Sequence, residues 1–109
     1  MSVTAEQLAA VKAYMRVPAE DTSEDAVIGA LYESAQGYLL GAGVSEPPQG
    51  DPWRALYLTC LWGLTLWYYD HRDDAGDAEA FPLGLRKGIQ QLKHLQEVDA
   101  AVAGELAEA

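Results

Sequence analysis

Residues 53–69, WRALYLTCLWGLTLWYY, decide the fold of this 109-residue chain. The run holds all three tryptophans and a single charged residue, Arg54, near its start. Asp51-Pro52 before it is typical of a helix N-cap followed by proline at the first helical position, and the polar DHRDDA of residues 70–75 ends it. A helix of this length spans about 25 Å, at about 1.5 Å per residue. Because it is apolar on nearly every side, it predicts a bundle in which other helices or another subunit cover it.

The same run is too short and too polar for a membrane span. A transmembrane helix needs roughly 20 mostly apolar residues, and Thr59, Thr65 and three tyrosines interrupt this one. Its flanks carry no cluster of lysine or arginine to orient a span. The N-terminal MSVTAEQLAA has no basic stretch followed by an apolar one, so it does not predict a signal peptide. We therefore expect a protein without membrane attachment.

Composition favours one compact domain and argues against several classes of protein. Half of the residues are hydrophobic, and 109 residues suffice for a single core. The single cysteine, Cys60, excludes a disulfide framework and fits a reducing cytosol. The formal net charge of −10 argues against a broad basic surface that holds nucleic acid. Such acidity favours solubility, and it also suits a surface that repels DNA or meets a basic partner.

A first helix is expected near the N-terminus. Thr4 and Gln7 have the spacing of a capping box, in which each side chain bonds the other's backbone N–H. One apolar face follows at helical spacing: Leu8, Val11 and Met15. Val17-Pro18 predicts the end of this helix, because the residue before a proline is pushed out of the helical region.

A second helix is expected after a polar link. Asp21 or Thr22 is expected to cap it, and Gly41 is expected to stop it. Between them runs an apolar stripe at helical spacing: Val27, Ile28, Leu31, Ala35, Tyr38 and Leu39. A Gly/Pro-rich loop, residues 41–50, then leads to the central helix and is too short to link two domains.

A fourth helix is expected to start at Pro82. Its predicted inward stripe is Leu85, Ile89, Leu92 and Leu95. Three of the chain's seven positive residues lie on it: Arg86, Lys87 and Lys93. They are expected to form either a solvated helix face or a contact with DNA or an acidic partner. Positive charge is mildly unfavourable in the first part of a helix, so the position of Arg86 and Lys87 favours the intermolecular contact.

The C-terminal segment, residues 98–109, is rich in Ala and Glu. Val98, Val102 and Leu106 continue the helical spacing of the fourth helix, while Gly104 interrupts it. The segment is therefore expected either to extend the fourth helix or to form an arm that is flexible until a partner orders it.

These patterns predict an all-α fold, a small four-helix bundle around a central helix at about residues 52–72, with a C-terminal arm or helix extension. Three thin apolar stripes cover three tryptophans incompletely, so we expect a neighbouring subunit to shield the remainder. One face of the central helix is expected to be left partly to solvent or to a partner: Arg54, Leu58, Leu61, Thr65, Tyr68 and Arg72. Gly63 costs about 1 kcal/mol within a helix, which predicts the close approach of a neighbouring helix.

No group of residues predicts catalysis. Asp70, His71 and Asp73 could bind a metal or transfer a proton, but on a helix Asp70 and His71 point in different directions. They are expected to form a solvated helix end. Cys60, in an apolar helix, is expected to have a raised pKa and to be unreactive. We therefore expect no enzyme activity, no cofactor and no metal, and metal analysis of the purified protein tests the enzymatic alternative.

Four short motifs occur in a fixed order along residues 8–95. They are VKAYMR (residues 11–16), EDAVI (24–28), YDHRD (69–73) and the pair Phe81-Pro82. Their order and spacing resemble the head–tail connector (adaptor) proteins of long-tailed double-stranded DNA bacteriophages and prophages. Members typically open with Val-Lys-x-Tyr-Leu-Arg, end the central helix in Tyr-Glu-Asn-Arg-Glu and start the last helix with Leu-Pro.

The resemblance implies a structural virion protein without enzymatic activity or cofactor. Residues 1–97 would form a single helical connector domain, and residues 98–109 a C-terminal arm. Copies would assemble into a ring, twelvefold by resemblance, that contacts the portal on one side and a head-completion or tail protein on the other, with DNA passing through its channel. The expected location is the head–tail junction of the virion, and the host cytoplasm before assembly.

Residues for the expected contacts with other subunits or with the portal come from the central helix, the fourth helix and the C-terminal segment. They are Arg54, Leu58, Leu61, Thr65, Tyr68, Arg72, Arg86, Lys87, Val98, Val102 and Leu106. A second hypothesis is a small cytosolic helical module of the antitoxin or adaptor type that binds one protein partner. Such a module would share the acidity and the apolar helix.

Overall fold

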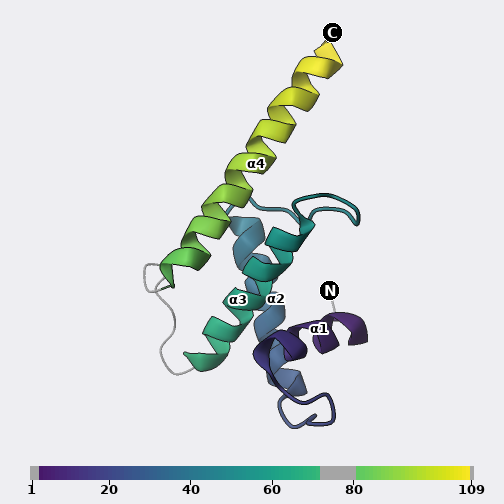
Figure 1. Ribbon diagram of the computed structural model, residues 1–109, viewed down its shortest axis with the longest axis vertical. Coiled ribbons are helices and arrows are strands. Elements are labelled where there is room, and N and C mark those ends of the chain that lie inside the picture. Colours follow the sequence, from purple (N-terminus) through teal and green to yellow (C-terminus); the bar gives the residue numbers. More distant parts are fainter. Residues whose placement is uncertain (1–2, 72–80, 109) are drawn as a thin grey trace.

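Four α-helices and no strand make up the part of the chain that the computed structural model describes, residues 3–71 and 81–108, with side chains to Val102 (Figure 1). They are α1 (Ala5–Met15), α2 (Asp25–Gly41), α3 (Arg54–Asp70) and α4 (Leu83–Glu108). The predicted all-α, four-helix fold is confirmed. No helix among these residues is both long enough and apolar enough to cross a membrane.

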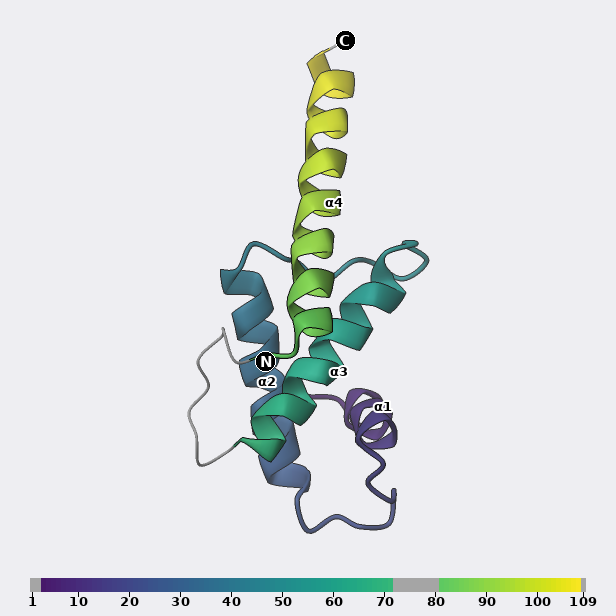
Figure 2. The ribbon, with the colours of Figure 1, turned by 60° about the vertical axis from the view of Figure 1, so that its left-hand side comes forward.

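The bundle is built on the pairing of α2 with α3, the most extensive helix contact, to which α4 and α1 are added on α3 (Figure 2). Its core is one cluster of buried side chains drawn from all four helices and from the connections between them. Those side chains are Val11, Ile28, Tyr32, Ala35, Leu39, Val44, Tyr57, Cys60, Leu61, Leu64, Trp67, Phe81, Ile89 and Leu92. At about 1.5–3 kcal/mol for each large side chain removed from water, this cluster is the main source of stability.

The ends of α1 and α2 lie where the capping and helix-breaking residues of the sequence predict them, with one exception. Thr4 and Gln7 form the predicted capping box, each side chain bonding the other's backbone N–H at 3.0–3.1 Å. The helix ends at Met15, before Val17-Pro18, and α2 ends at Gly41, both as predicted. The prediction that Asp21 or Thr22 caps α2 is wrong, because the Asp21 carboxylate accepts hydrogen bonds from Ser23 instead and α2 starts at Asp25.

The start of α3 lies slightly later than its sequence indicates. Asp51 does accept a backbone hydrogen bond, from the Trp53 N–H at 2.8 Å, but Pro52 and Trp53 form a turn and the helix begins at Arg54. Arg54 itself is used within the chain. Its Nη1 donates to the Pro47 carbonyl at 2.6 Å and lies 3.5 Å from the Glu46 carboxylate, so it fastens the preceding loop.

Phe81 fixes the chain where it enters α4. Its ring is buried and packs edge-on against Trp67, with centroids 4.8 Å apart, and against Tyr38 at 5.4 Å. A second attachment lies further along α4, where the Gln96 amide exchanges two hydrogen bonds with the Ser45 backbone, at 3.0 and 2.7 Å. These two points, together with the buried Ile89 and Leu92, hold the first half of α4 on the bundle.

The C-terminal segment extends α4, which is one of the two arrangements that its sequence allows. The helix is continuous through Gly104 to Glu108, 26 residues in all. Its last turns project away from the other three helices in both ribbon views (Figures 1 and 2). Every described side chain from Glu97 to Val102 is exposed, so this end of α4 is not part of the core.

The bundle covers its central helix better than the sequence indicates. All of α3 is described, and none of its large apolar side chains is among the exposed ones. Several are only partly buried, as is Trp53 just before the helix: Leu56, Leu58, Trp62, Tyr68 and Tyr69. The expectation that the face from Arg54 to Arg72 stays open is wrong at its centre. Leu61 and Thr65 are completely buried, and the Thr65 hydroxyl donates to the Leu61 carbonyl at 2.8 Å. These two residues have no surface to offer a partner.

Candidate functional site

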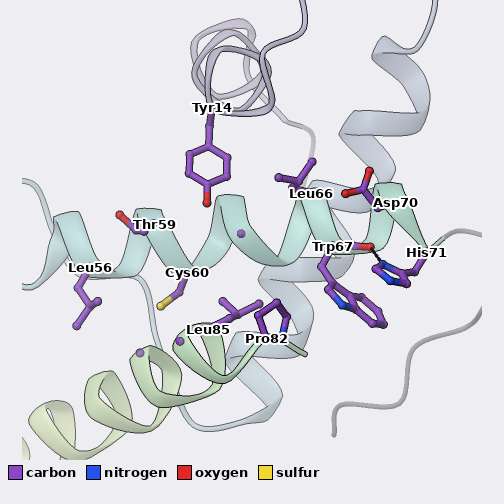
Figure 3. A pocket seen from close by; sticks show the side chains of 13 residues that line it. Tyr14, Leu56, Thr59, Cys60, Leu66, Trp67, Asp70, His71, Pro82 and Leu85 are labelled. Carbon is purple, nitrogen blue, oxygen red and sulfur yellow. Dashed lines mark hydrogen bonds between the residues drawn. The ribbon is translucent and has the colours of Figure 1, made fainter. Parts of the chain in front are cut away.

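A groove of about 640 Å³ runs between α3 and α4, on the side of α3 opposite to Leu61 and Thr65. Figure 3 shows Tyr14 pointing from α1 toward α3, and Leu85 and Pro82 lying on the α4 side of the groove. This volume lies within the range that is typical of ligand-binding pockets. Its lining is mainly apolar and consists of Tyr14, Leu56, Thr59, Cys60, Gly63, Leu66, Trp67, Asp70, His71, Pro82, Gly84, Leu85 and Gly88.

Two glycines bring α3 and α4 together at the floor of this groove. A Cβ atom added to Gly88 would lie 3.0 Å from the Cys60 sulfur, and one added to Gly63 would lie 3.4 Å from Leu85 Cδ1. The predicted close approach of a helix at Gly63 is therefore confirmed, and the approaching helix is α4. Because a glycine on each helix faces a side chain of the other, the two helices pack more closely here than larger residues would allow.

Cys60 lies at this contact and is a packing residue. Its side chain is buried, and burial raises the pKa of its thiol to about 11. The thiolate, which is the nucleophilic form, is therefore scarce at neutral pH. The prediction of a raised pKa and an unreactive thiol agrees with this environment.

The acidic end of α3 forms one end of the groove. The His71 ring stacks on Trp67, with centroids 4.2 Å apart and 12° between planes, and its Nδ1 lies 2.8 Å from the Trp67 carbonyl. His71 is the C-cap of α3, so its ring covers the last turn of the helix. Within the described ranges, no three His, Cys, Asp or Glu side chains come together in a way that could hold a metal ion. Asp73 lies outside those ranges.

The remaining predicted contact residues divide between surface and core. Arg86 and Lys87 are exposed on α4, as are Val98 and Val102, whose side chains are 44% and 50% exposed. Leu58 and Tyr68 are partly buried against the core. Arg72 and the side chain of Leu106 lie outside the described residues. The predicted residues that the structure describes are therefore divided between the surface and the core.

The groove and four exposed apolar residues were not predicted from the sequence. Leu40, Leu83 and Tyr14 are exposed although each is large and apolar or aromatic. Val27 is exposed as well, so its place in the predicted apolar stripe of α2 is wrong. The sequence does hold one signal for the groove, which is the occurrence of Gly63 on α3 and of Gly84 and Gly88 on α4. Small residues on two neighbouring helices indicate close packing, and the surfaces beside such a contact are left without a covering side chain.

A scan against protein-family models found no match for this chain, and neither a search of curated proteins nor a search of solved structures found one. The case for a function therefore rests on the order of the motifs and on the surfaces that the fold leaves exposed.

Proposed function

We propose that this chain is the subunit of a phage-type head–tail connector, a structural protein that assembles as a ring between portal and tail. The motifs that carry the sequence resemblance lie at boundaries of the fold. VKAYMR closes α1, EDAVI opens α2, YDHRD begins in the last turn of α3, and Phe81-Pro82 directly precedes α4. Motifs at helix ends determine how the helices are joined. Their positions therefore support the inference of a connector fold from the order of the motifs.

The observation that carries the proposal furthest is the projecting end of α4. Residues 97–108 continue the helix beyond the bundle, and Val98 and Val102 expose apolar side chains on it. A helical stretch of about 12 residues is marginal in water without packing. A subunit that presents such a helix is suited to an assembly in which another protein covers it, as a connector requires.

The net charge of −10 supports a further part of this proposal, an acidic channel. Like charge between the channel wall and the DNA phosphates would let the duplex pass without binding. A structure of the assembled ring tests this directly. A neutral or basic lumen would rule out the acidic lining.

The experiment for the main proposal is co-expression with a phage portal protein, followed by electron microscopy of the purified complex. We expect a ring of this protein on the portal. Val102→Glu places a charge in the exposed apolar stripe of α4 and should reduce binding to the portal ring at least tenfold, while leaving the helix content unchanged.

Val27→Glu is the matched control, because Val27 is an exposed valine on α2, away from α4. It should assemble like the wild type. Equal binding by Val102→Glu and the wild type would remove the end of α4 from the interface. The absence of any ring on the portal would contradict the connector proposal itself.

A second candidate function, a small helical module that binds one protein partner, is favoured by the groove between α3 and α4. Its apolar lining and its volume of about 640 Å³ suit an inserted segment of another protein. Light scattering of the complex distinguishes the two functions, since the module would give a small complex of fixed stoichiometry and the connector a large ring.

A further inference from the structure

The end of α4 differs in charge from the rest of the helix. Residues 83–96 contain Arg86, Lys87 and Lys93 and no Asp or Glu. Residues 97–108 contain Glu97, Asp99, Glu105 and Glu108 and no Lys or Arg. Acidic residues near the C-terminus of a helix are unfavourable for the isolated helix. These charges therefore do not stabilise α4 itself, and any partner of this end has to complement them.

A small hollow lies where this end of α4 leaves the bundle. It has a volume of about 190 Å³ and is formed by the loop between α2 and α3 together with α4. The loop contributes Glu46, Pro47, Asp51 and Trp53 to its lining, and α4 contributes Gln96 and Asp99. The two hydrogen bonds between the Gln96 amide and the Ser45 backbone, at 3.0 and 2.7 Å, hold the loop against the helix. The hollow is therefore formed within the single chain.

The hollow carries negative charge that the chain itself leaves uncompensated. Glu46, Asp51 and Asp99 lie around it, and its lining holds no lysine or arginine from the described part of the chain. Arg54, outside the lining, lies 3.5 Å from the Glu46 carboxylate. Among the described residues, no ion pair involves Asp51 or Asp99. A cationic group in the hollow would therefore meet two carboxylates that no cation neutralises.

The size and lining of the hollow suit one side chain of another protein. Its volume of about 190 Å³ lies below the roughly 300 Å³ at which ligand pockets typically begin. Trp53 places an indole among the carboxylates, and the guanidinium group of an arginine can stack on an aromatic ring while it bonds a carboxylate. These features favour an arginine side chain over a free small molecule.

Apolar surface continues from the hollow along the end of α4. Val98 directly precedes Asp99, Val102 follows one helical turn later, and both valines are exposed. At 3.6 residues per turn, Asp99 lies about 80° around the helix from the line of the two valines, so it borders their surface. A segment that covers the valines therefore passes beside the carboxylate that lines the hollow.

We propose that the end of α4 and this hollow form one docking surface for a basic, apolar segment of another protein. An arginine of that segment enters the hollow, and its apolar side chains cover Val98 and Val102. The acidity of the surface argues against nucleic acid, and the net charge of −10 on each copy argues against a second copy of this chain. The inference rests on the proposed function for its setting and deepens it, because it names the chemistry of the partner that covers α4.

NMR titration of the full chain with defined peptides tests this surface. The probe is a short, end-capped helical peptide with leucines along one face and a single arginine beside them. We expect shifts at residues 45–53 and 95–102, and we expect Trp53 to shift most among the three tryptophan indole signals. A counterpart with glutamine in place of the arginine should bind at least fivefold more weakly, and so should one with serine in place of the leucines.

Asp99→Asn tests the charge without threatening the fold, because Asp99 is exposed on the projecting helix. It should weaken binding of the arginine peptide at least fivefold and remove its advantage over the glutamine peptide. Asp70→Asn is the matched control, since Asp70 is also exposed and lines the groove between α3 and α4 instead. This control should bind the arginine peptide as the wild type does.

Several results would overturn the inference. They are a wild-type chain that does not bind the arginine peptide, equal affinity for the arginine and glutamine peptides, unchanged binding by Asp99→Asn, and shifts confined to the groove between α3 and α4. Self-association of the wild type through residues 95–102 would also overturn it, because a second copy would then cover the surface. No portal is present in these measurements. Peptide binding without a ring on the portal would therefore contradict the connector proposal alone.

Discussion

At the scale of single residues, Lys12 makes the most specific polar contact of the fold. It is only 4% exposed, and its ammonium group lies 2.8 Å from the Asp25 carboxylate. It also donates to the carbonyls of Asp21, at 2.7 Å, and of Ala19, at 3.3 Å. One side chain of α1 therefore fixes the connection to α2 and the first residue of α2. A buried ammonium is tolerated here because its hydrogen bonds and its charge are both satisfied.

We predict that Lys12→Met destabilises the protein by about 2–3 kcal/mol, because it leaves the Asp25 carboxylate and two carbonyl groups without their donor. Methionine keeps most of the length and apolar surface of lysine, so the loss measures the polar contacts. Urea denaturation followed by tryptophan fluorescence gives the free energy of unfolding.

Lys87→Met is the control for the loss of a positive charge, since Lys87 is exposed, and it should stay within about 0.5 kcal/mol of the wild type. Asp25→Asn in the Lys12→Met background should recover part of the loss, because it removes the unpaired carboxylate. A Lys12→Met variant as stable as the wild type would show that these contacts contribute nothing net.

At the scale of helices, the contact between α3 and α4 depends on small residues. A Cβ atom at Gly88 would lie 3.0 Å from the Cys60 sulfur, so the sulfur would have to move by a few tenths of an ångström, while Gly37 on α2 has open space around it. Both lie inside helices, where alanine is favoured over glycine by about 1 kcal/mol. Substitution by alanine at Gly37 therefore reports helix propensity alone, whereas substitution at Gly88 reports helix propensity and packing together.

Gly37→Ala is predicted to stabilise the protein by up to about 1 kcal/mol, whereas Gly88→Ala should lose that gain and destabilise it by about 1–3 kcal/mol through overpacking. Thermal or urea unfolding measures both. Adding Cys60→Ala should reverse much of the Gly88→Ala effect, since it removes the sulfur that the new methyl group meets. Additive effects of Gly88→Ala and Cys60→Ala would contradict a direct contact.

At the scale of the whole molecule, burial of ionisable groups sets the response to alkali. Burial raises the pKa of Tyr57 to about 12 and that of Cys60 to about 11, and it also raises the pKa of Tyr32 and Tyr68. In the unfolded chain these groups lose their protons near their ordinary values of 9.0 and 10.0. The folded state therefore holds protons that the unfolded state releases, and it loses stability as the pH rises.

Below about pH 9, we predict that these groups do not change the free energy of unfolding. As the pH rises from about 9 toward 12, the free energy of unfolding should decrease. Tyr57→Phe should make the decrease between pH 10 and 12 less steep, because one of the contributing protons is absent. Equal slopes for Tyr57→Phe and the wild type would show that Tyr57 ionises equally in both states.

Much of this fold can be predicted from local patterns. The capping box of Thr4 and Gln7, the stop at Gly41 and the start after Pro82 act within a few residues, and the structure has them where the sequence places them. The predicted capping of α2 by Asp21 is wrong, although it too is a local interaction. A carboxylate can accept hydrogen bonds from several nearby N–H groups, and the local sequence does not say from which one. Most of the core stripes of α2 and α4 were also predictable, since a helix repeats its faces regularly. Val27, at the start of the predicted α2 stripe, is the exception, because its side chain is exposed.

The candidate site was less predictable, because it depends on which faces meet. A helix that is apolar on all sides gives no periodic signal for its open side, so the sequence placed that side at Leu61 and Thr65, whereas the groove lies opposite. The burial of Lys12 was likewise missed. A lysine is expected at the surface, and only the approach of Asp25 from the next helix makes its burial possible.

The sequence by itself determined that this protein is all-α, where most of its helices begin and end, and that the two halves of its last helix carry opposite charge. These properties follow from local hydrogen bonding, from helical periodicity and from composition. The tertiary structure alone decided which side of α3 is covered, that α4 leaves the bundle after Gln96, and that a groove lies beside Gly63 and Gly88. Those features arise from contacts between residues far apart in the chain, whose packing no local pattern encodes.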